Sequence, residues 1–443
     1  MKKTYITALF LAQCFTLSAQ QIHVGSLRTD SKKDVELTTL MAGNKYQKAG
    51  SKLVAFIGYS NKGLEDISSL RLGYRFDDGE ATYIDCNKEL KVNATGSTIA
   101  NITIPASLAA GPHKLSVFVD NIEGKTPENS DGDKIENNYV IYTKSLEHQM
   151  TYVEQYCSQN SQYANNVNPG MDAAAKSGYI SLVNVYKDGE PLAAEGASNL
   201  EELYAYTYPC FTVNRFYFSG ENYIAYDVND YAYLPDFAQT SVKDIVAEAR
   251  NTNPAFATVN VTSTYSPDTH QVTLDVTGDV SDEAKLAYGD IGLTLMAVEN
   301  GVKAKQLLSD GTVDNNYVHN HVLRAYITNP NGERMDVVDG KYSKSYTYIV
   351  PTKWNIDNMD VVATVGKYVP KVDDSNVLDV DITNAAIVKL TGGVSGITNV
   401  KAGGASTAAD GIYTINGTRV NDAKAKGIYI VRKDGVARKV VVK

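Results

Sequence analysis

Cysteine is scarce in this chain, which limits how the fold can be held together. The 443 residues contain 4 cysteines, at positions 14, 86, 157 and 210. Removal of a leader that contains Cys14 would leave an odd number. A disulfide-rich scaffold is therefore excluded, and at least one thiol stays unpaired or buried.

Long hydrophobic runs and an excess of basic charge are also missing. Beyond residue 20, no segment approaches the roughly 18 consecutive apolar residues that a membrane-spanning helix needs. The chain has 42 Lys and Arg residues against 51 Asp and Glu residues, a net charge of −9. Nucleic acid, which needs a basic surface, is therefore excluded as a partner, and no basic run favours an anionic membrane.

The sequence motifs of common active sites are absent as well. There is no G-x-S-x-G, no P-loop and no H-E-x-x-H. Carboxylates are plentiful, as in any acidic protein, so they single out no pair for glycoside hydrolysis. The motifs therefore offer no catalytic site.

What is present begins with the pattern of a secretory signal peptide. Two lysines precede a mostly apolar run, Ile6–Leu17, and small or polar residues follow it. This order predicts a signal peptide over residues 1–20 and export into the cell envelope. A lipoprotein is the alternative because the run contains Cys14, but Gln13 before it is not the small residue that lipidation requires.

Residues 21–147 have the pattern of a β-sandwich. Short stretches that alternate apolar and polar residues are separated there by Gly, Asn and Asp turns. The whole chain has 30 tyrosines against 10 phenylalanines, which suits half-buried strands with wet outer faces.

Strands and helices alternate in residues 148–257, which predicts an α/β layer. A polar, alanine-containing stretch over 159–177 has helical spacing, but Pro169 should kink or interrupt the helix. From 258 to 391 the strand pattern returns and predicts a second β-sandwich. The predicted fold class is therefore multidomain and mainly β.

Residues 392–443 have the composition of a linker followed by a small β-module. Gly, Ala, Ser and Thr dominate up to Asp410, which favours a flexible segment. Asn416-Gly417 and Asp434-Gly435 then each lie between β-rich runs, the strongest short-range signal for a hairpin.

Four stretches in the middle of the chain resemble a known family, the 28-kDa class of outer-membrane proteins of Bacteroidetes. They are YVEQY at 152–156, YPCFTVNR at 208–215, YVHNHVLR at 317–324 and KWNIDNMDVVATV at 353–365. The similarity spans residues 148–391. It implies a thioredoxin-like domain without a CxxC motif over 148–257 and a β-sandwich domain over 258–391.

The two ends of the chain resemble other modules of bacterial surface proteins. The run that begins YSNKGLEDISSLRLGYRFDDG is similar to adhesion-related immunoglobulin-like domains, which implies such a sandwich over 21–147. The tail, with GIYTINGTRV, KGIYIV and a basic KVVVK ending, resembles the sorting domains that type IX secretion recognises. This implies a sorting-like β-module within 392–443.

The thioredoxin-like resemblance implies where a redox site would lie. Such a site needs two cysteines separated by two residues at the start of a helix, whose dipole lowers the thiol pKa. The alignment puts these positions at Ser161 and Ala164, neither of which supplies a thiolate. Cys157 lies four residues too early. We therefore expect that redox chemistry has been lost.

The same resemblance suggests structural roles for three residues. Pro209 matches the cis-proline that thioredoxin-like folds place opposite the redox loop, so we expect a cis bond between Tyr208 and Pro209. The strand that begins at Cys210 should lie beside the strand that ends at Cys157. We hypothesise a structural disulfide between these cysteines, which the oxidising envelope permits; two buried thiols are the alternative.

Two clusters raise the question of a metal. His319 and His321 lie two residues apart on an expected strand, so both would face one side; packing is the simpler interpretation. Asp131, Asp133 and Glu136 surround a glycine, but their spacing departs from that of an EF-hand, and a solvated turn is preferred. We expect no metal and no cofactor.

The function expected from these observations is non-enzymatic binding or scaffolding at the outer membrane or cell surface, or after secretion. The expected partners are the type IX machinery, through the tail, and an unidentified surface ligand. One alternative is an envelope thiol–disulfide redox protein that uses Cys157 and Cys210. Another is a carbohydrate-binding accessory protein that uses the tyrosine-rich stretch 204–233, although strand packing explains those tyrosines more simply.

Overall fold

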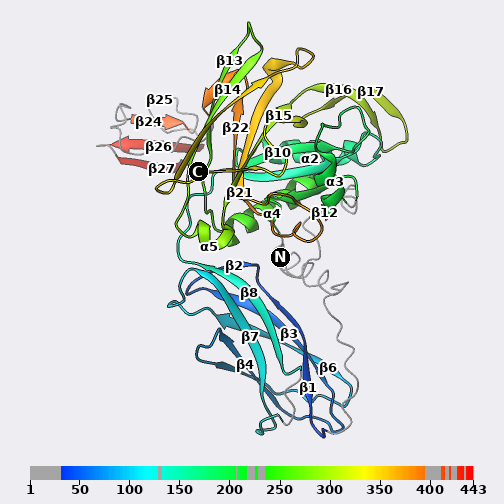
Figure 1. Ribbon diagram of the computed structural model, residues 1–443, viewed down its shortest axis with the longest axis vertical. Helices are drawn as coiled ribbons and strands as arrows, with labels where there is room; N and C mark the ends of the chain where they lie inside the picture. The colour runs from blue at the N-terminus through cyan, green and yellow to red at the C-terminus, as the bar shows by residue number, and fades with distance from the viewer. Residues whose placement is uncertain are drawn as a thin grey trace. The chain divides into compact units, whose positions relative to one another are not determined.

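The computed structural model describes most of the chain between residues 31 and 442. The described ranges are 31–127, 132–205, 207–216, 225–227, 235–394, 411–414, 419–420, 427–433 and 436–442. The predicted signal peptide, residues 1–20, lies outside them. The described chain is multidomain and mainly β, as the sequence predicted (Figure 1). It divides into two compact units, residues 1–396 and 397–443.

The first β-sandwich consists of two sheets with the strand orders β1-β3-β6 and β2-β8-β7-β4-β5. The strands are β1 (Val35–Ala42), β2 (Tyr46–Lys48), β3 (Lys52–Asn61), β4 (Leu70–Phe76), β5 (Thr82–Cys86), β6 (Thr95–Thr103), β7 (Gly111–Ile122) and β8 (Lys134–Tyr142). Ile57 and Ile102 from one sheet pack against Leu72 and Val117 from the other. The alternation of apolar residues along each strand is what builds this shared core.

A larger sheet has the strand order β12-β11-β9-β10-β18-β15-β21-β22, with β19 beside β15. Its strands are β9 (Thr151–Cys157), β10 (Ile180–Tyr186), β11 (Cys210–Val213), β12 (Ala225–Asp227), β15 (Ile291–Glu299), β18 (Val322–Tyr326), β19 (Glu333–Arg334), β21 (Met359–Lys367) and β22 (Ile382–Lys389). The sheet curves until β22 returns to the start of β9. There Met150 and Ala385 exchange two backbone hydrogen bonds, of 3.3 and 2.9 Å.

Strands from both sides of the expected boundary at residue 257 therefore share one sheet. β10 and β18 join its two halves through a parallel pairing at Asn184 and Val322. The backbone N–H of Asn184 also donates to the carbonyl of His321 at 2.7 Å. The sequence predicted an α/β layer over 148–257 and a separate β-sandwich over 258–391, whereas in the structure strands of both segments form one sheet. Sequence patterns give no sign of this join, because the pairing of distant parallel strands leaves no local signal.

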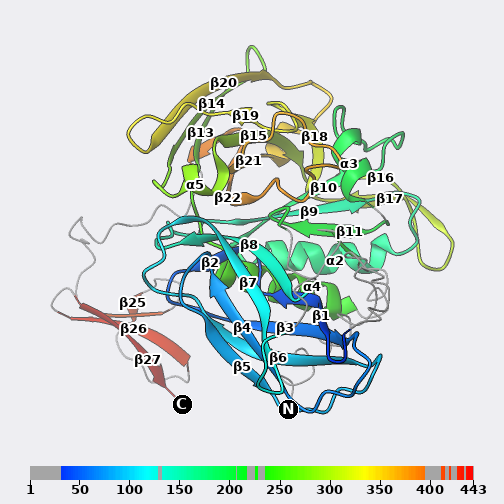
Figure 2. The ribbon, with the colours of Figure 1, turned by 60° about the horizontal axis from the view of Figure 1, so that its bottom comes forward.

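The helices are α2 (Ala164–Ala175), α3 (Ser198–Tyr204), α4 (Pro235–Thr252), α5 (Ala284–Tyr288) and the 3₁₀ turn η2 (Ile356–Asn358). α2 and α4 lie along one face of β9, β10 and β11 (Figure 2). Val167 and Met171 of α2 pack there against Val153 of β9. None of the described helices is long and apolar enough to cross a membrane.

Pro169 lies inside α2 and does not interrupt it, so of the two expected effects, a kink or an interruption, the interruption is wrong. A proline removes one backbone hydrogen bond from a helix. Val167 and Met171 on either side of it are each 1% exposed, and the burial of this face offsets that loss.

A second sheet, of order β20-β14-β13-β23, packs against the large sheet. Its strands are β13 (Asn260–Ser266), β14 (Gln271–Asp279), β20 (Lys341–Ile349) and β23 (Gly392–Val394). Val261 and Val276 pack against Leu293 and Val361 of the large sheet in one core. β23 corrects an expectation, because its residues were assigned to the linker but pair with β13. A hairpin of β16 (Val302–Leu307) and β17 (Val313–His319) completes this part.

Tyr46 of β2, in the first sandwich, packs into the core between the second sheet and the large sheet. Its ring lies among Phe216, Phe256 and Tyr288, with ring centres 5.8, 5.6 and 6.1 Å away. Its hydroxyl donates to a carboxylate oxygen of Asp381 at 2.5 Å. An aromatic ring buried in this way carries a large share of the packing energy between two layers.

The second unit contains β24 (Gly411–Thr414), β25 (Arg419–Val420), β26 (Gly427–Lys433) and β27 (Val436–Val442). All its pairings are antiparallel, in the order β25-β24-β26-β27. The strand pairs β24–β25 and β26–β27 flank the two expected hairpin turns. The turn residues Asn416-Gly417 and Asp434-Gly435 themselves lie outside the described residues.

Candidate functional site

The loop between β9 and α2 contains the positions at which a redox site would lie. The hydroxyl of Ser161 donates to the carbonyl of Tyr208 at 2.9 Å. The bond between Tyr208 and Pro209 is cis, the isomer that the resemblance implied. Ala164 is the first residue of α2 and is 1% exposed. The structure therefore brings Ser161 to the proline turn, but neither position carries sulfur.

Two polar side chains hold this loop in place. Glu190 accepts hydrogen bonds from the Ser158 hydroxyl and the Gln159 backbone N–H, both at 2.6 Å. Gln306 of β16, which is fully buried, donates to the carbonyls of Ser158 and Ser161 at 3.3 and 2.9 Å. Because an unpaired buried amide is costly, these contacts keep β16 on the loop. The start of the loop is thus packed against β16, whereas Asn160 and Gln162 are exposed.

The expected disulfide between Cys157 and Cys210 is not formed, and the described residues contain no disulfide bond. Both side chains are 0% exposed, so the alternative of two buried thiols describes the structure. The register pairs Cys210 with Tyr156, which places it beside β9 as expected. Burial raises the pKa of the Cys157 thiol well above its ordinary value, and Cys210 raises it further. A thiolate at Cys157 is therefore disfavoured.

A buried ion pair that sequence analysis missed lies on the same strand. Glu154 of β9 and Arg215, after β11, are 0% and 6% exposed. Two guanidinium nitrogens of Arg215 donate to the two carboxylate oxygens of Glu154, each at 2.7 Å. The Tyr152 hydroxyl adds a third hydrogen bond, of 3.0 Å, to the carboxylate. Burial lowers the pKa of Arg215, but the Glu154 carboxylate outweighs this and raises it, so the guanidinium stays charged.

The two histidines weighed as metal ligands do not share a strand face. β17 ends at His319, and His321 follows with a left-handed backbone, φ 52°. His319 Nδ1 lies 2.7 Å from the Tyr186 hydroxyl, whereas His321 Nε2 lies 3.8 Å from Asp172. Burial lowers the pKa of both histidines. Within the described ranges no three His, Cys, Asp or Glu side chains gather as a metal site.

The acidic turn weighed as a calcium site is only partly described, because Asp131 lies outside the described residues. Glu136 forms ion pairs with Lys114 and Lys134. Hydrogen bonds from these two ammonium groups lower the pKa of Glu136 to about 2. Its carboxylate is therefore already neutralised by lysines of the same sheet.

The tyrosine-rich stretch 204–233 is described only in part. Tyr204 is 3% exposed and packs against Tyr156 in the core, so it offers no ring for stacking on a sugar. Tyr208 is partly buried under the ammonium group of Lys187, 5.2 Å from its ring. The remaining tyrosines lie outside the described residues or in β12, of whose side chains nothing is described.

A hollow of about 610 Å³ lies at one end of the second sheet. Asn260, Thr277 and Ser343 line it from three neighbouring strands, paired across β13, β14 and β20. Gly278 and Tyr342 lie side by side in the same register and form part of the wall. A Cβ at position 278 would overlap the Tyr342 ring and a backbone carbonyl, so this wall requires glycine.

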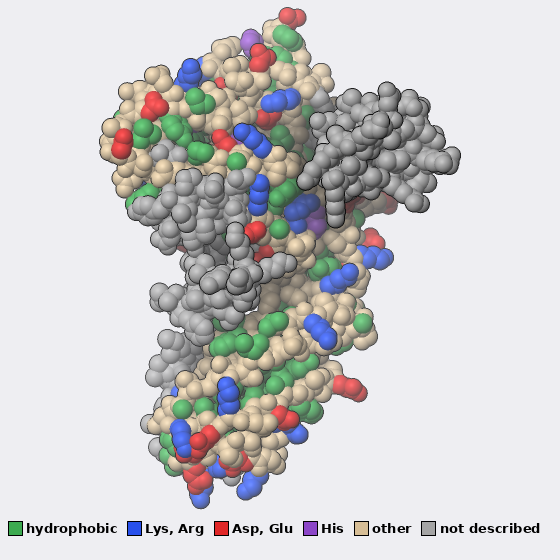
Figure 3. All heavy atoms as spheres, turned by 180° about the vertical axis from the view of Figure 1, so that it is seen from behind, with side chains coloured by type: hydrophobic (Ala, Val, Ile, Leu, Met, Phe, Trp, Pro, Cys, Tyr) green, Lys and Arg blue, Asp and Glu red, His purple; other side chains and the backbone are tan. Residues whose placement is uncertain are grey.

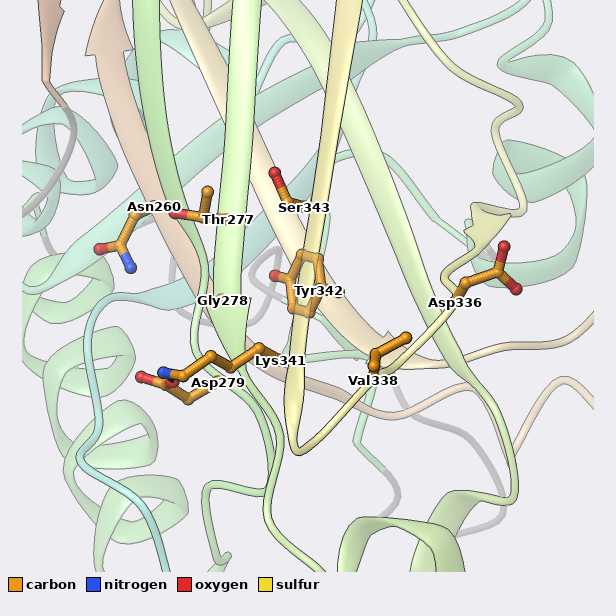
Figure 4. Close-up of a pocket in the computed structure, with 9 residues that line it drawn as sticks. All are labelled: Asn260, Thr277, Gly278, Asp279, Asp336, Val338, Lys341, Tyr342 and Ser343. Atoms are coloured by element: carbon orange, nitrogen blue, oxygen red, sulfur yellow. Dashed lines mark hydrogen bonds and ion pairs between the residues drawn. The ribbon is translucent and has the colours of Figure 1, made fainter.

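Charged groups line two sides of the hollow. Lys341 and Asp279 form an ion pair of 2.5 Å at one end, and Asp336 and Val338 lie on the other side of Tyr342 (Figure 4). Val338 is 68% exposed, which leaves one apolar contact at the rim. The hollow therefore offers hydroxyl, amide and carboxylate groups for hydrogen bonds, with no nucleophile and base in contact.

Comparison with known proteins finds a family model that matches this part of the chain. Residues 198–387 match the family model described as outer membrane protein Omp28. The Omp28 match confirms the expected resemblance over that range, which includes Pro209, Arg215 and the hollow. The protein is accordingly a cell-envelope protein of the outer membrane or cell surface. No curated protein matches the chain.

Solved structures give weaker likenesses. HBP35 of Porphyromonas gingivalis is 17% identical, with a TM-score of 0.43, over 68% of this chain and 100% of that chain. A domain of the outer membrane lipoprotein Omp28 from Porphyromonas gingivalis is 19% identical, with a TM-score of 0.21, over 31% of this chain and 88% of that one. The CARDB domain of PF1109 from Pyrococcus furiosus, solved with di-metal ions, is 11% identical, with a TM-score of 0.21, over 28% and 100%.

Substitution of the buried ion pair tests how strongly it is coupled. Glu154→Leu alone or Arg215→Met alone should each lower the free energy of unfolding by about 3–5 kcal/mol, because each leaves a buried charge unpaired. The double variant should lose clearly less than the sum of the two. Urea unfolding followed by circular dichroism measures all four proteins. Additive losses would show that the two charges do not depend on each other.

Proposed function

We propose that the protein is a non-enzymatic binding or scaffold protein of the cell surface. The observation that carries this proposal is the state of the loop before α2. A hydroxyl and a methyl group stand at positions 161 and 164, and the nearby thiols of Cys157 and Cys210 are fully buried. A thiol that stays protonated and out of reach cannot attack a disulfide.

The strand order supports a thioredoxin-like origin for the α/β part. β9 and β10 are parallel and joined through α2, β11 runs antiparallel to β9, β12 runs antiparallel to β11, and α4 follows. This βαβ–ββα order is the one that the resemblance implies. The two-sheet core of the first sandwich likewise supports the immunoglobulin-like interpretation. In this proposal, the α/β part and the first sandwich supply rigid surfaces for binding and catalyse no reaction.

Surface charge is compatible with such a role. On the face that Figure 3 shows, acidic and basic side chains are interspersed over the described surface. The net charge of −9 gives no support for a nucleic-acid partner. The type IX machinery remains the proposed partner of the tail, on the basis of the resemblance of residues 411–443.

A dithiol assay separates this proposal from the redox alternative. The purified mature protein should not reduce insulin with dithiothreitol above the uncatalysed rate, and Cys157→Ser should leave that rate unchanged. Because Cys157 lies in the core, the variant should show only a lower unfolding midpoint. Cys86→Ser, which alters a buried thiol in the first sandwich, is the matched control. Turnover by the wild-type protein that Cys157→Ser abolishes would refute the proposal in favour of the redox enzyme.

Removal of the tail tests the proposed route to the surface. Deletion of residues 392–443 would also remove β23, so the deletion should start at residue 397, where the second unit begins. The truncated protein should accumulate in the periplasm, while the full chain reaches the cell surface, because the sorting-like module is missing. Cell fractionation and protease shaving measure both. Unchanged surface display of the truncated protein would contradict a sorting role.

A further inference from the structure

The second sheet turns an unusual face away from the core. Three registered rows cross β13, β14 and β20 on this side. The rows are Asn260–Thr277–Ser343, Thr262–Asp275–Ser345 and Thr264–Thr273–Thr347. Seven of these nine side chains carry a hydroxyl group, and one carries a charge.

The outward direction of these rows is set by the core on the other side. Val261, Val272, Leu274 and Val276 alternate with them along β13 and β14 and are each 0–1% exposed. Because side chains alternate between the two faces of a strand, this burial fixes the hydroxyl-bearing residues on the opposite face. The face is therefore a rigid array, with neighbouring strands about 4.8 Å apart.

The nine side chains of the rows carry a single charge, the carboxylate of Asp275. Asp275 accepts a hydrogen bond of 2.5 Å from the Ser345 hydroxyl within the second row. At the end of the sheet Asp279 and Lys341 neutralise each other. Most protein surfaces instead carry a dense mixture of charges. An anionic ligand would therefore find no cationic side chain along the rows.

The first row opens into the hollow described above. Asn260, Thr277 and Ser343 belong both to the row and to its lining. Asp336, on the loop before β20, adds a carboxylate, and Val338 adds an exposed apolar surface. The hollow and the rows thus form one continuous surface of hydrogen-bonding groups with a recess at one end.

We propose that the hollow and the three rows form a binding site for a neutral polysaccharide, whose end or branch enters the hollow. This inference rests on the proposed function and names its ligand class. Each hydroxyl can both donate and accept, as the hydroxyls of a sugar chain do, so the two arrays are complementary. The carboxylates of Asp275 and Asp336 can accept further hydrogen bonds from sugar hydroxyls. An apolar peptide would find only Val338, and a polyanion would find only the paired Lys341.

The test is affinity electrophoresis of the full mature protein through gels that contain dextran, galactomannan or hydroxyethylcellulose. At least one of these neutral polymers should retard the wild-type protein. Thr277→Val/Ser343→Ala should bind that polymer about 3- to 10-fold more weakly per hydroxyl removed, because each lost neutral hydrogen bond has that effect. Asp336→Ala should also weaken binding. Because Asp336 lies outside the sheet, a loss of binding by this variant cannot be ascribed to misfolding of the sheet.

The matched control is Thr95→Val/Ser97→Ala, which removes the same two hydroxyl types from the exposed face of β6 in the first sandwich. It should be retarded as strongly as the wild-type protein. The inference is overturned if none of the three polymers retards the protein, if the sheet variant is retarded as strongly as the control, or if only polygalacturonate, an anionic comparator, retards it. Any of these results, with a negative dithiol assay and normal surface display, would leave the proposed function intact.

Discussion

The ion pair between Glu154 and Arg215 constrains the centre of the large sheet. Two charges removed from water are tolerated only where hydrogen bonds and opposite charge replace the lost hydration. Here the carboxylate receives two guanidinium bonds and one from Tyr152. The guanidinium also lies 5.9 Å from the Tyr152 ring and 5.6 Å from the Tyr204 ring. β9, α3 and the end of β11 must therefore meet in one arrangement.

The loop before α2 keeps a defined conformation although it contains no redox cysteines. The loop follows β9 directly, and Glu190 and Gln306 satisfy its polar groups from two sides. β16, in the hairpin that follows β15, contacts the loop through the side chain of Gln306. The thiols of Cys157 and Cys210 then serve as small buried hydrophobic groups.

What the sequence could predict follows from local patterns. The alternation of apolar and polar residues predicted the strands of the first sandwich, and turn residues predicted the paired strands of the tail. The family resemblance predicted the cis bond before Pro209. The sequence could not predict the pairing of β10 with β18, because this pairing links Asn184 and Val322, which are 138 positions apart. Likewise Glu154 has the appearance of a surface residue in a strand until Arg215, far along the chain, is placed against it.

The candidate binding surface was beyond prediction for a similar reason. Thr and Ser residues on β13, β14 and β20 are ordinary solvent-facing strand residues when each strand is considered alone. Only the register aligns them into rows and brings Asp336 and Val338 to the end of the first row. The role of Gly278 is equally dependent on its neighbours, because the carbonyl of Thr258 and the ring of Tyr342 together leave no room for a Cβ there.

The proposed non-enzymatic role depends on the inaccessibility of the Cys157 thiol. Alkylation of the native protein by iodoacetamide between pH 7 and pH 9, with peptide mapping by mass spectrometry, tests this most directly. Burial raises the pKa of this thiol well above its ordinary value, so modification should stay negligible across the range and become complete only in urea. Rapid modification in the native state, rising with an apparent pKa at or below the ~8.5 of a free cysteine, would contradict the account.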